Sequence, residues 1–182
     1  MPGGGVWNVM PGQVTDDSEL AMCLLRGLVA GRGKLDLFQH ALYYGHWIAS
    51  EPFDIGGTIK NGLSKLALSL DNPDPCLAQS RALNGKGAKS MSNGSLMRIT
   101  PLAVWARNLN VENLHKCVVA EISMTHSMQA IHFACTAYCI AIKVLTKNAD
   151  DDNRAAMAVQ AVRDYAAGSP SMTLKKWMQS VD

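Results

Sequence analysis

The spacing of apolar residues along the chain predicts α-helices almost throughout. Apolar side chains recur every three or four positions with polar residues between them, which is the period of a helix with one buried face. The pattern is interrupted at glycines and prolines and at helix-capping residues, and we expect Asp36, Thr58 and Ser95 each to cap a helix. On this basis we expect helices at about 20–29, 37–48, 58–70, 76–83, 95–105, 111–123, 127–147 and 152–167, and a short final helix after 171.

Alternating apolar and polar residues, the mark of a half-buried strand, are almost absent. The sequence shows no internal repeat, no low-complexity tract and no convincing interdomain linker. We therefore predict an all-α fold, a compact multi-helix bundle, with residues 1–182 forming a single domain.

The segment from Met128 to Leu145 is apolar and nearly long enough to cross a membrane. It also carries Gln129, His132 and Lys143, and polar or charged residues are rare within membrane spans. We therefore interpret this segment as a buried core helix and expect no membrane partner.

Composition and charge narrow the class of protein. The chain has 182 residues, of which 48% are hydrophobic and 18% charged, and this balance is typical of a globular protein. The net charge is +2 and no basic block occurs, so we expect no nucleic-acid partner. Five cysteines without a C-x-x-C pair suggest reduced thiols. The N-terminus lacks the charged and apolar regions of a signal peptide, and we expect a cytoplasmic location.

Thr15, Asp16 and Asp17 place a hydroxyl and two adjacent carboxylates at the start of the first predicted helix. Mg²⁺ prefers oxygen ligands of this kind, and neighbouring carboxylates repel each other unless a cation lies between them. The same residues allow a second interpretation, in which Asp16 and Glu19 form a capping box at the helix N-terminus.

Asn93, Gly94 and Ser95 form a second candidate site, because backbone N–H groups, an amide and a hydroxyl at a helix start suit phosphate or ribose oxygens. The alternative is a solvated loop that ends in a serine N-cap. His126 lies at a junction between two predicted helices, where it could donate to a ligand oxygen or simply face a helix C-terminus.

One further set of residues carries two interpretations. His132, Cys135 and Cys139 share one helical face, so a zinc site is conceivable, but the helix is otherwise apolar and we favour core packing as the explanation.

Taken together, four segments resemble the ADP-ribosylglycohydrolase family, which includes the dinitrogenase reductase-activating glycohydrolases. Their order and approximate spacing also agree with that family. The matching segments are Pro11-Gly12-Gln13-Val14-Thr15-Asp16-Asp17-Ser18, Phe53-Asp54-Ile55-Gly56, Ser92-Asn93-Gly94-Ser95-Leu96-Met97-Arg98-Ile99-Thr100-Pro101-Leu102 and Ser123-Met124-Thr125-His126.

The resemblance implies an all-α enzyme that holds two Mg²⁺ ions and cleaves the glycosidic bond between ADP-ribose and a protein side chain, commonly arginine or serine. Thr15, Asp16 and Asp17 would be metal ligands, and the two aspartates would be the catalytic residues. Substrate contacts would come from Asn93, Gly94, Ser95 and His126. The expected partner is an ADP-ribosylated protein or a small molecule of the ADP-ribose type.

The sequence also departs from the family pattern. The family's Gly-Asp-Ala-x-Gly stretch with its acidic residue and its Asp-x-Asp-Thr motif are both missing. We therefore expect a domain truncated at both ends, weak Mg²⁺ binding and impaired turnover, since affinity for the ion depends on ligand number and charge. The alternative function is a non-catalytic ADP-ribose binder, or a structural protein like the jellyfish lens crystallins that resemble this family.

Overall fold

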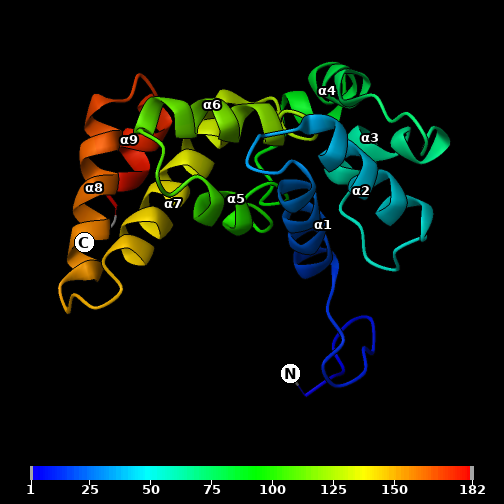
Figure 1. The fold of residues 1–182 in the computed structure, drawn as a ribbon, viewed down its shortest axis with the longest axis horizontal. Coiled ribbons are helices and arrows are strands. Elements are labelled where there is room, and N and C mark those ends of the chain that lie inside the picture. Colours follow the sequence, from blue (N-terminus) through cyan, green and yellow to red (C-terminus); the bar gives the residue numbers. More distant parts are fainter. Residues whose placement is uncertain (1, 181–182) are drawn as a thin grey trace.

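The computed structural model describes residues 2–180, and within them the fold is all-α, as predicted. Its elements follow one another along a single long axis, with α1 to α4 at one end and α8 and α9 at the other (Figure 1). The helices are α1 (Asp16–Ala30), α2 (Leu37–Ala49), α3 (Gly57–Leu63), α4 (Pro75–Asn84), α5 (Thr100–Trp105), α6 (Val111–Ile122), α7 (Gln129–Lys147), α8 (Arg154–Gly168) and α9 (Met172–Met178).

The first two helices pack closely together. Leu20, Leu24 and Leu28 recur at every fourth position of α1 and are buried, so they form one apolar face. The approach to α2 is tightest at Gly27, where an added Cβ would lie 2.4 Å from Cδ2 of His40. Only glycine fits there, because any larger residue would force the two helices apart.

The long helix α7 organises the rest of the core. It packs against α5, α6, α8 and α9, and it buries seven of its residues, including Cys135, Thr136 and Cys139. By length and composition alone it is the one described helix that could cross a membrane. Its contacts on several sides are those of a core helix, as its polar residues predict.

The predicted start of one helix was wrong. We expected Ser95 to cap a helix over 95–105, but residues 93–98 form turns and α5 begins at Thr100. In a helix, the backbone N–H of Arg98 would donate to the carbonyl of Gly94. Here the Arg98 side chain takes that carbonyl instead, with Nη1 3.0 Å from Gly94 O. Pro101 lies in the first turn of α5, where its missing N–H costs nothing.

Two capping expectations also differ from the structure. Thr15, not Asp16, is the N-cap residue of α1, and the Glu19 carboxylate accepts a hydrogen bond from Trp47 Nε1 at 2.7 Å rather than reaching back to a cap. Gly56 rather than Thr58 precedes α3 as its N-cap, and the Thr58 hydroxyl lies 2.9 Å from that of Ser90. Tertiary contacts therefore use side chains that the local sequence assigns to helix ends.

A fully buried charged network joins four segments of the chain. Arg98 Nε lies 3.2 Å from Oε1 of Glu121 on α6, and Nη2 lies 3.0 Å from Oγ1 of Thr125. The Tyr44 hydroxyl on α2 donates to the same Glu121 oxygen at 2.6 Å, and its ring lies 5.3 Å from the guanidinium carbon of Arg98. Burial alone would lower the pKa of Arg98, but Glu121 and Tyr44 raise it, so the guanidinium stays charged.

We predict that Glu121→Gln strongly destabilises the protein. The amide keeps the size of the side chain but removes the charge that compensates buried Arg98. Loss of one partner of such a pair typically costs about 3–5 kcal/mol. Urea unfolding would measure the loss.

Glu112→Gln is the matched control for this variant. Glu112 lies on the same helix and pairs with Lys116 at 2.6 Å, but both side chains are exposed, so its replacement should leave the unfolding midpoint unchanged. Equal effects of the two variants would contradict the importance we assign to the buried network.

Candidate functional site

Thr15, Asp16 and Asp17 lie together at the first turn of α1. The Thr15 hydroxyl donates to Asp17 Oδ2 at 3.3 Å, and Asp17 is exposed to solvent. Asp16 is only 8% exposed, and its carboxylate is faced by the backbone N–H groups of Gly56 and Asp17. The three side chains thus offer a hydroxyl and two carboxylates, one turned inward and one outward.

A third carboxylate, that of Asp54, lies near this pair. Burial raises the pKa of Asp16, and the negative charges of Asp54 and then Asp17 raise it further, while N–H groups of Gly56 and Asp17 act in the opposite direction. Sequence reasoning did not assign Asp54 to the site, although it stands in the Phe53-Asp54-Ile55-Gly56 match. The repulsion is what a site for a cation would show before the cation binds.

The acidic groups do not form a closed metal cage by themselves. Among the described residues, no group of three or more His, Cys, Asp or Glu side chains is arranged to hold a metal ion. This statement includes His132, Cys135 and Cys139, so the described structure offers no support for a zinc site. At the acidic turn, the oxygen donors suit Mg²⁺ by their chemistry, with water or ligand oxygens needed to complete the coordination.

The loop that contains Asn93, Gly94 and Ser95 packs against α3 and α7. Ser92 and Asn93 are exposed, whereas Gly94 and Ser95 are buried. A Cβ on Gly94 would lie 3.0 Å from Ile59 Cδ1, so this residue must stay small for the loop to rest on α3. The Ser95 hydroxyl lies 3.5 Å from the sulfur of Cys135 in the core and offers no solvent-facing atom to a ligand.

His126 lies directly behind this loop. Its Nε2 is 2.9 Å from the Ser92 hydroxyl, and its Nδ1 is 2.9 Å from Oγ1 of Thr125. Burial lowers the pKa of His126 to about 4, and the positive charge of Arg98 and the nearby His132 ring contribute to this shift. The imidazole is therefore neutral at physiological pH and acts through hydrogen bonds rather than charge.

The start of α3 connects the acidic turn to the loop. Gly56 faces Asp16, Thr58 contacts Ser90 beside the loop, and Ile59 packs against Gly94. Cα atoms two residues apart are separated by at most about 7 Å. The first turn of α3 therefore contacts both Asp16 and the loop that carries Ser92, although these are far apart in sequence.

The charge next to this turn is not only negative. Lys86 is exposed, and its Nζ lies 3.3 Å from the position that a Cβ on Gly57 would occupy. An ammonium group thus lies beside the first turn of α3. Anionic and cationic parts of a ligand or cofactor would find different partners there.

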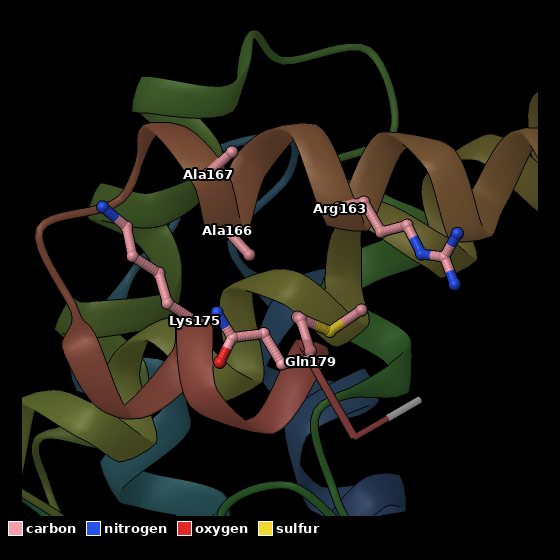
Figure 2. Close-up of a pocket in the computed structure, with 6 residues that line it drawn as sticks. Arg163, Ala166, Ala167, Lys175 and Gln179 are labelled. Carbon is pink, nitrogen blue, oxygen red and sulfur yellow. The ribbon is translucent and has the colours of Figure 1, made fainter. Parts of the chain in front are cut away.

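The described structure also contains a cavity far from this site. It has a volume of about 300 Å³ and lies between α8 and α9, at the other end of the molecule from α1 (Figures 1 and 2). The cationic ends of Arg163 and Lys175 point away from each other there (Figure 2). This arrangement provides no converging pair of charges for an anion.

Comparison with known proteins identifies the family. The model of the ADP-ribosylglycohydrolase family matches residues 1–182. A protein of Acanthamoeba polyphaga mimivirus, whose name assigns it provisionally to the ADP-ribosyl glycohydrolases, is 33% identical over 130 residues, which are 69% of this chain and 37% of that protein.

Two bacterial relatives carry more specific names. The ADP-ribosyl-[dinitrogen reductase] glycohydrolase of Rhodospirillum rubrum is 30% identical over 135 residues, covering 74% of this chain and 42% of the relative. An ADP-ribosylarginine hydrolase of Pseudomonas putida is 26% identical over 174 residues, covering 90% of this chain and 43% of the relative. The chain therefore spans about two-fifths of the length of these curated relatives.

We predict that Asp16→Asn stabilises the protein at pH 7 when divalent cations are removed by a chelator. The raised pKa of Asp16 means that the folded protein holds this proton more tightly than the unfolded chain does. The stabilising effect of protonation is complete below the ordinary pKa of 3.8 and is lost as the pH rises through the higher pKa of the folded state. Asparagine mimics the protonated form.

Thermal unfolding at a series of pH values checks this expectation. The gain in melting temperature should shrink as the pH is lowered towards 3.8, the ordinary pKa of the group. Asp152→Asn, at an exposed position between α7 and α8, is the control and should not reproduce the gain. A loss of stability in Asp16→Asn at pH 7 would contradict the repulsion described here.

Proposed function

Because the chain belongs to the ADP-ribosylglycohydrolase family, we propose that it takes part in Mg²⁺-dependent hydrolysis of the glycosidic bond between ADP-ribose and a protein side chain. The observation that carries this proposal is that the start of α3 contacts both parts of the site: Gly56 faces Asp16, and Thr58 contacts Ser90, which donates to Ser92 beside His126. One side offers oxygen ligands for a cation, and the other offers hydrogen-bonding groups for a ligand.

Thr15, Asp16 and Asp17 are the residues we propose to hold Mg²⁺. The donor set fits by its chemistry, because hard oxygen atoms lie where neighbouring carboxylates repel each other, and a cation would relieve that repulsion. When bound, Mg²⁺ would supply Lewis-acid assistance to oxygen atoms at the reacting centre. We expect weak affinity, since these residues provide only part of an octahedral shell.

The two aspartates have different environments and therefore different proposed roles. Asp17 is exposed, and its carboxylate is oriented by the Thr15 hydroxyl, so it can accept a proton from an attacking water. Asp16 is buried, and its carboxylate is oriented by the N–H groups of Gly56 and Asp17, which suits a fixed ligand. Hydrolysis of a glycosidic bond passes through an oxocarbenium-like state that nearby carboxylates stabilise.

We propose that the loop around Asn93 contacts ADP-ribose. The exposed Ser92 and Asn93 side chains would meet the ligand directly, and buried Gly94 would let the loop lie close to α3 and His126. His126 would act from behind Ser92. Buried Ser95 would hold the loop in place through its contact with Cys135.

Arginine is the side chain that the comparisons favour as the attachment point. The relative from Pseudomonas putida is named as an ADP-ribosylarginine hydrolase, whereas neither of the other two names specifies serine. We therefore propose ADP-ribosylarginine as the first substrate to test, with ADP-ribosylserine as the comparison.

A non-catalytic ADP-ribose binder is the second candidate. It is favoured by one observation, namely that the described residues contain no complete set of metal ligands. A binder would need the loop and His126 but not the carboxylate pair. The two candidates thus depend on different parts of the site.

We predict that the chain releases ADP-ribose from an ADP-ribosylated arginine peptide only when Mg²⁺ is present. Asp17→Asn should lower the rate about a hundredfold or more, as expected for loss of a general base. Asp16→Asn should raise the Mg²⁺ concentration needed for half-maximal rate. Chromatographic detection of free ADP-ribose measures both effects, with Asp152→Asn as the control for a charge change at a distance.

Two outcomes would contradict the hydrolase. Turnover that is unaffected by Asp16→Asn and Asp17→Asn would place the chemistry elsewhere. Thermal stabilisation by ADP-ribose without any turnover, at any Mg²⁺ concentration, would favour the binder instead.

A further inference from the structure

A row of three hydroxyl groups, those of Thr58, Ser90 and exposed Ser92, ends at buried His126. The Thr58 hydroxyl lies 2.9 Å from that of Ser90, which donates to Ser92 Oγ at 3.0 Å. Ser92 Oγ lies 2.9 Å from His126 Nε2. Each hydroxyl has one proton to donate, so the orientation of one group constrains the next.

The direction of this row is set at its buried end, at Thr125. Arg98 Nη2 donates to Thr125 Oγ1 at 3.0 Å, and arginine can only donate. The Thr125 hydroxyl itself donates to the carbonyl of Ile122 at 3.2 Å. With its proton used in this way, Thr125 can only accept from His126, whose Nδ1 lies 2.9 Å away.

The opposite arrangement makes fewer of these contacts. If the Thr125 hydroxyl donated its one proton to His126 Nδ1, it could no longer donate to the Ile122 carbonyl, and that hydrogen bond would be lost. Nε2 of His126 would then carry the proton and donate to Ser92. Only the arrangement with a protonated Nδ1 forms every hydrogen bond described for Thr125, His126 and Ser92 at the same time.

A protonated Nδ1 on His126 fixes the orientation of the Ser92, Ser90 and Thr58 hydroxyls. Neutral imidazole carries one N–H, so Nε2 must accept, and Ser92 must donate its proton inward. Ser90 donates to Ser92 and accepts from the Ser92 backbone N–H at 3.3 Å. Thr58 is then the donor in its contact with Ser90. Each hydroxyl proton thus points along the row towards His126, and exposed Ser92 keeps one lone pair free for a ligand.

We propose that Thr125 is a positioning residue that fixes the tautomer of His126 and so makes the exposed Ser92 hydroxyl an acceptor, which selects a sugar hydroxyl over a phosphate oxygen. This inference rests on the function proposed above and specifies which part of ADP-ribose faces Ser92. A ribose hydroxyl can donate to the free lone pair of Ser92. A phosphate oxygen has no proton to donate at that point and would be repelled.

The neutral state of His126 supports the selection. Burial, with Arg98 and His132 nearby, lowers its pKa to about 4, so at pH 7 the ring carries no second proton that Ser92 could relay to an anion. The exposed ammonium of Lys86, beside Gly57, provides a separate partner for phosphate. The site thus distinguishes the two kinds of oxygen in the ligand by position.

Histidine-labelled protein at pH 7 tests the tautomer directly by long-range proton–nitrogen correlation in NMR. We expect His126 to show a protonated Nδ1 and an unprotonated Nε2. His132 is an internal reference of the opposite tautomer, because its Nε2 donates to the backbone carbonyl of His126 at 2.9 Å. The His126 signals are assigned by their loss in His126→Asn. A protonated Nε2 in the wild-type His126 would overturn the proposal.

Two variants of Thr125 separate positioning from packing. Thr125→Val keeps the shape but removes the hydroxyl, and should shift His126 towards the Nε2–H tautomer and weaken ADP-ribose binding about fivefold, the effect of one neutral hydrogen bond. Thr125→Ser restores the hydroxyl and should restore the wild-type tautomer and affinity. If Thr125→Val does not fold, the wild-type spectrum and Thr125→Ser still decide. A Ser variant with an altered tautomer overturns the role of Thr125.

The ligand preference is tested with ADP-ribose and inorganic pyrophosphate as probes. We expect ADP-ribose to move the Nε2 resonance of His126 through Ser92, and pyrophosphate to leave it in place. A shift with pyrophosphate, or with neither probe, would overturn the selection of a hydroxyl. Absent turnover together with the expected tautomer and ADP-ribose response would instead overturn the proposed hydrolase and leave this inference standing.

Discussion

The structure depends above all on one buried guanidinium group. Arg98 is fully excluded from solvent, and its charge is tolerated because Glu121 lies against it and Tyr44 donates to the same carboxylate. An isolated buried charge of this kind would cost far more than the marginal stability of a domain allows. The network must therefore form completely, and its formation fixes the relative positions of α2, α6 and the loop before α5.

The same group links stability to the site. Two further guanidinium hydrogens go to the Gly94 carbonyl and the Thr125 hydroxyl. Gly94 belongs to the loop, and Thr125 contacts His126. The position of the loop thus depends on buried contacts of Arg98 as well as on local sequence preferences. Residues 95–98, where the local pattern favours a helix, form turns, and the Gly94 carbonyl accepts from the Arg98 side chain.

Much of the fold could be predicted because most helix boundaries are local. Asp36 and Asp74 cap α2 and α4 by accepting from the N–H two residues later, as their positions suggest, and the periodic apolar residues define α6, α7 and α8 closely. The failures at Thr58, Glu19 and Ser95 share one cause. Each side chain is used by a distant partner, respectively Ser90, Trp47 and Cys135.

The candidate site was predictable only in part, for the same reason. The family pattern pointed to Thr15, Asp16, Asp17 and the Asn93 loop, because these residues form contiguous motifs. Asp54 and Ser92 lay inside matched segments, yet nothing local distinguishes them from ordinary surface polar residues. Asp54 lies near Asp16, and Ser92 contacts His126. These tertiary contacts can be recognised only once the three-dimensional fold is known.

The site has two parts, the loop beside His126 and the carboxylates around Asp16. They differ in whether their polar groups are already stabilised without a ligand. Both ring nitrogens of His126 have partners, Ser92 and Thr125, so these hydrogen bonds are in place before a ligand arrives. Around Asp16 the balance is unfavourable, because buried and neighbouring carboxylates raise its pKa. A preorganised half needs only a ligand of the right polarity, whereas a repulsive half gains stability from a cation. Ligand and cation would therefore stabilise this protein through different contacts, the ligand at the loop beside His126 and the cation at the carboxylates in the first turn of α1.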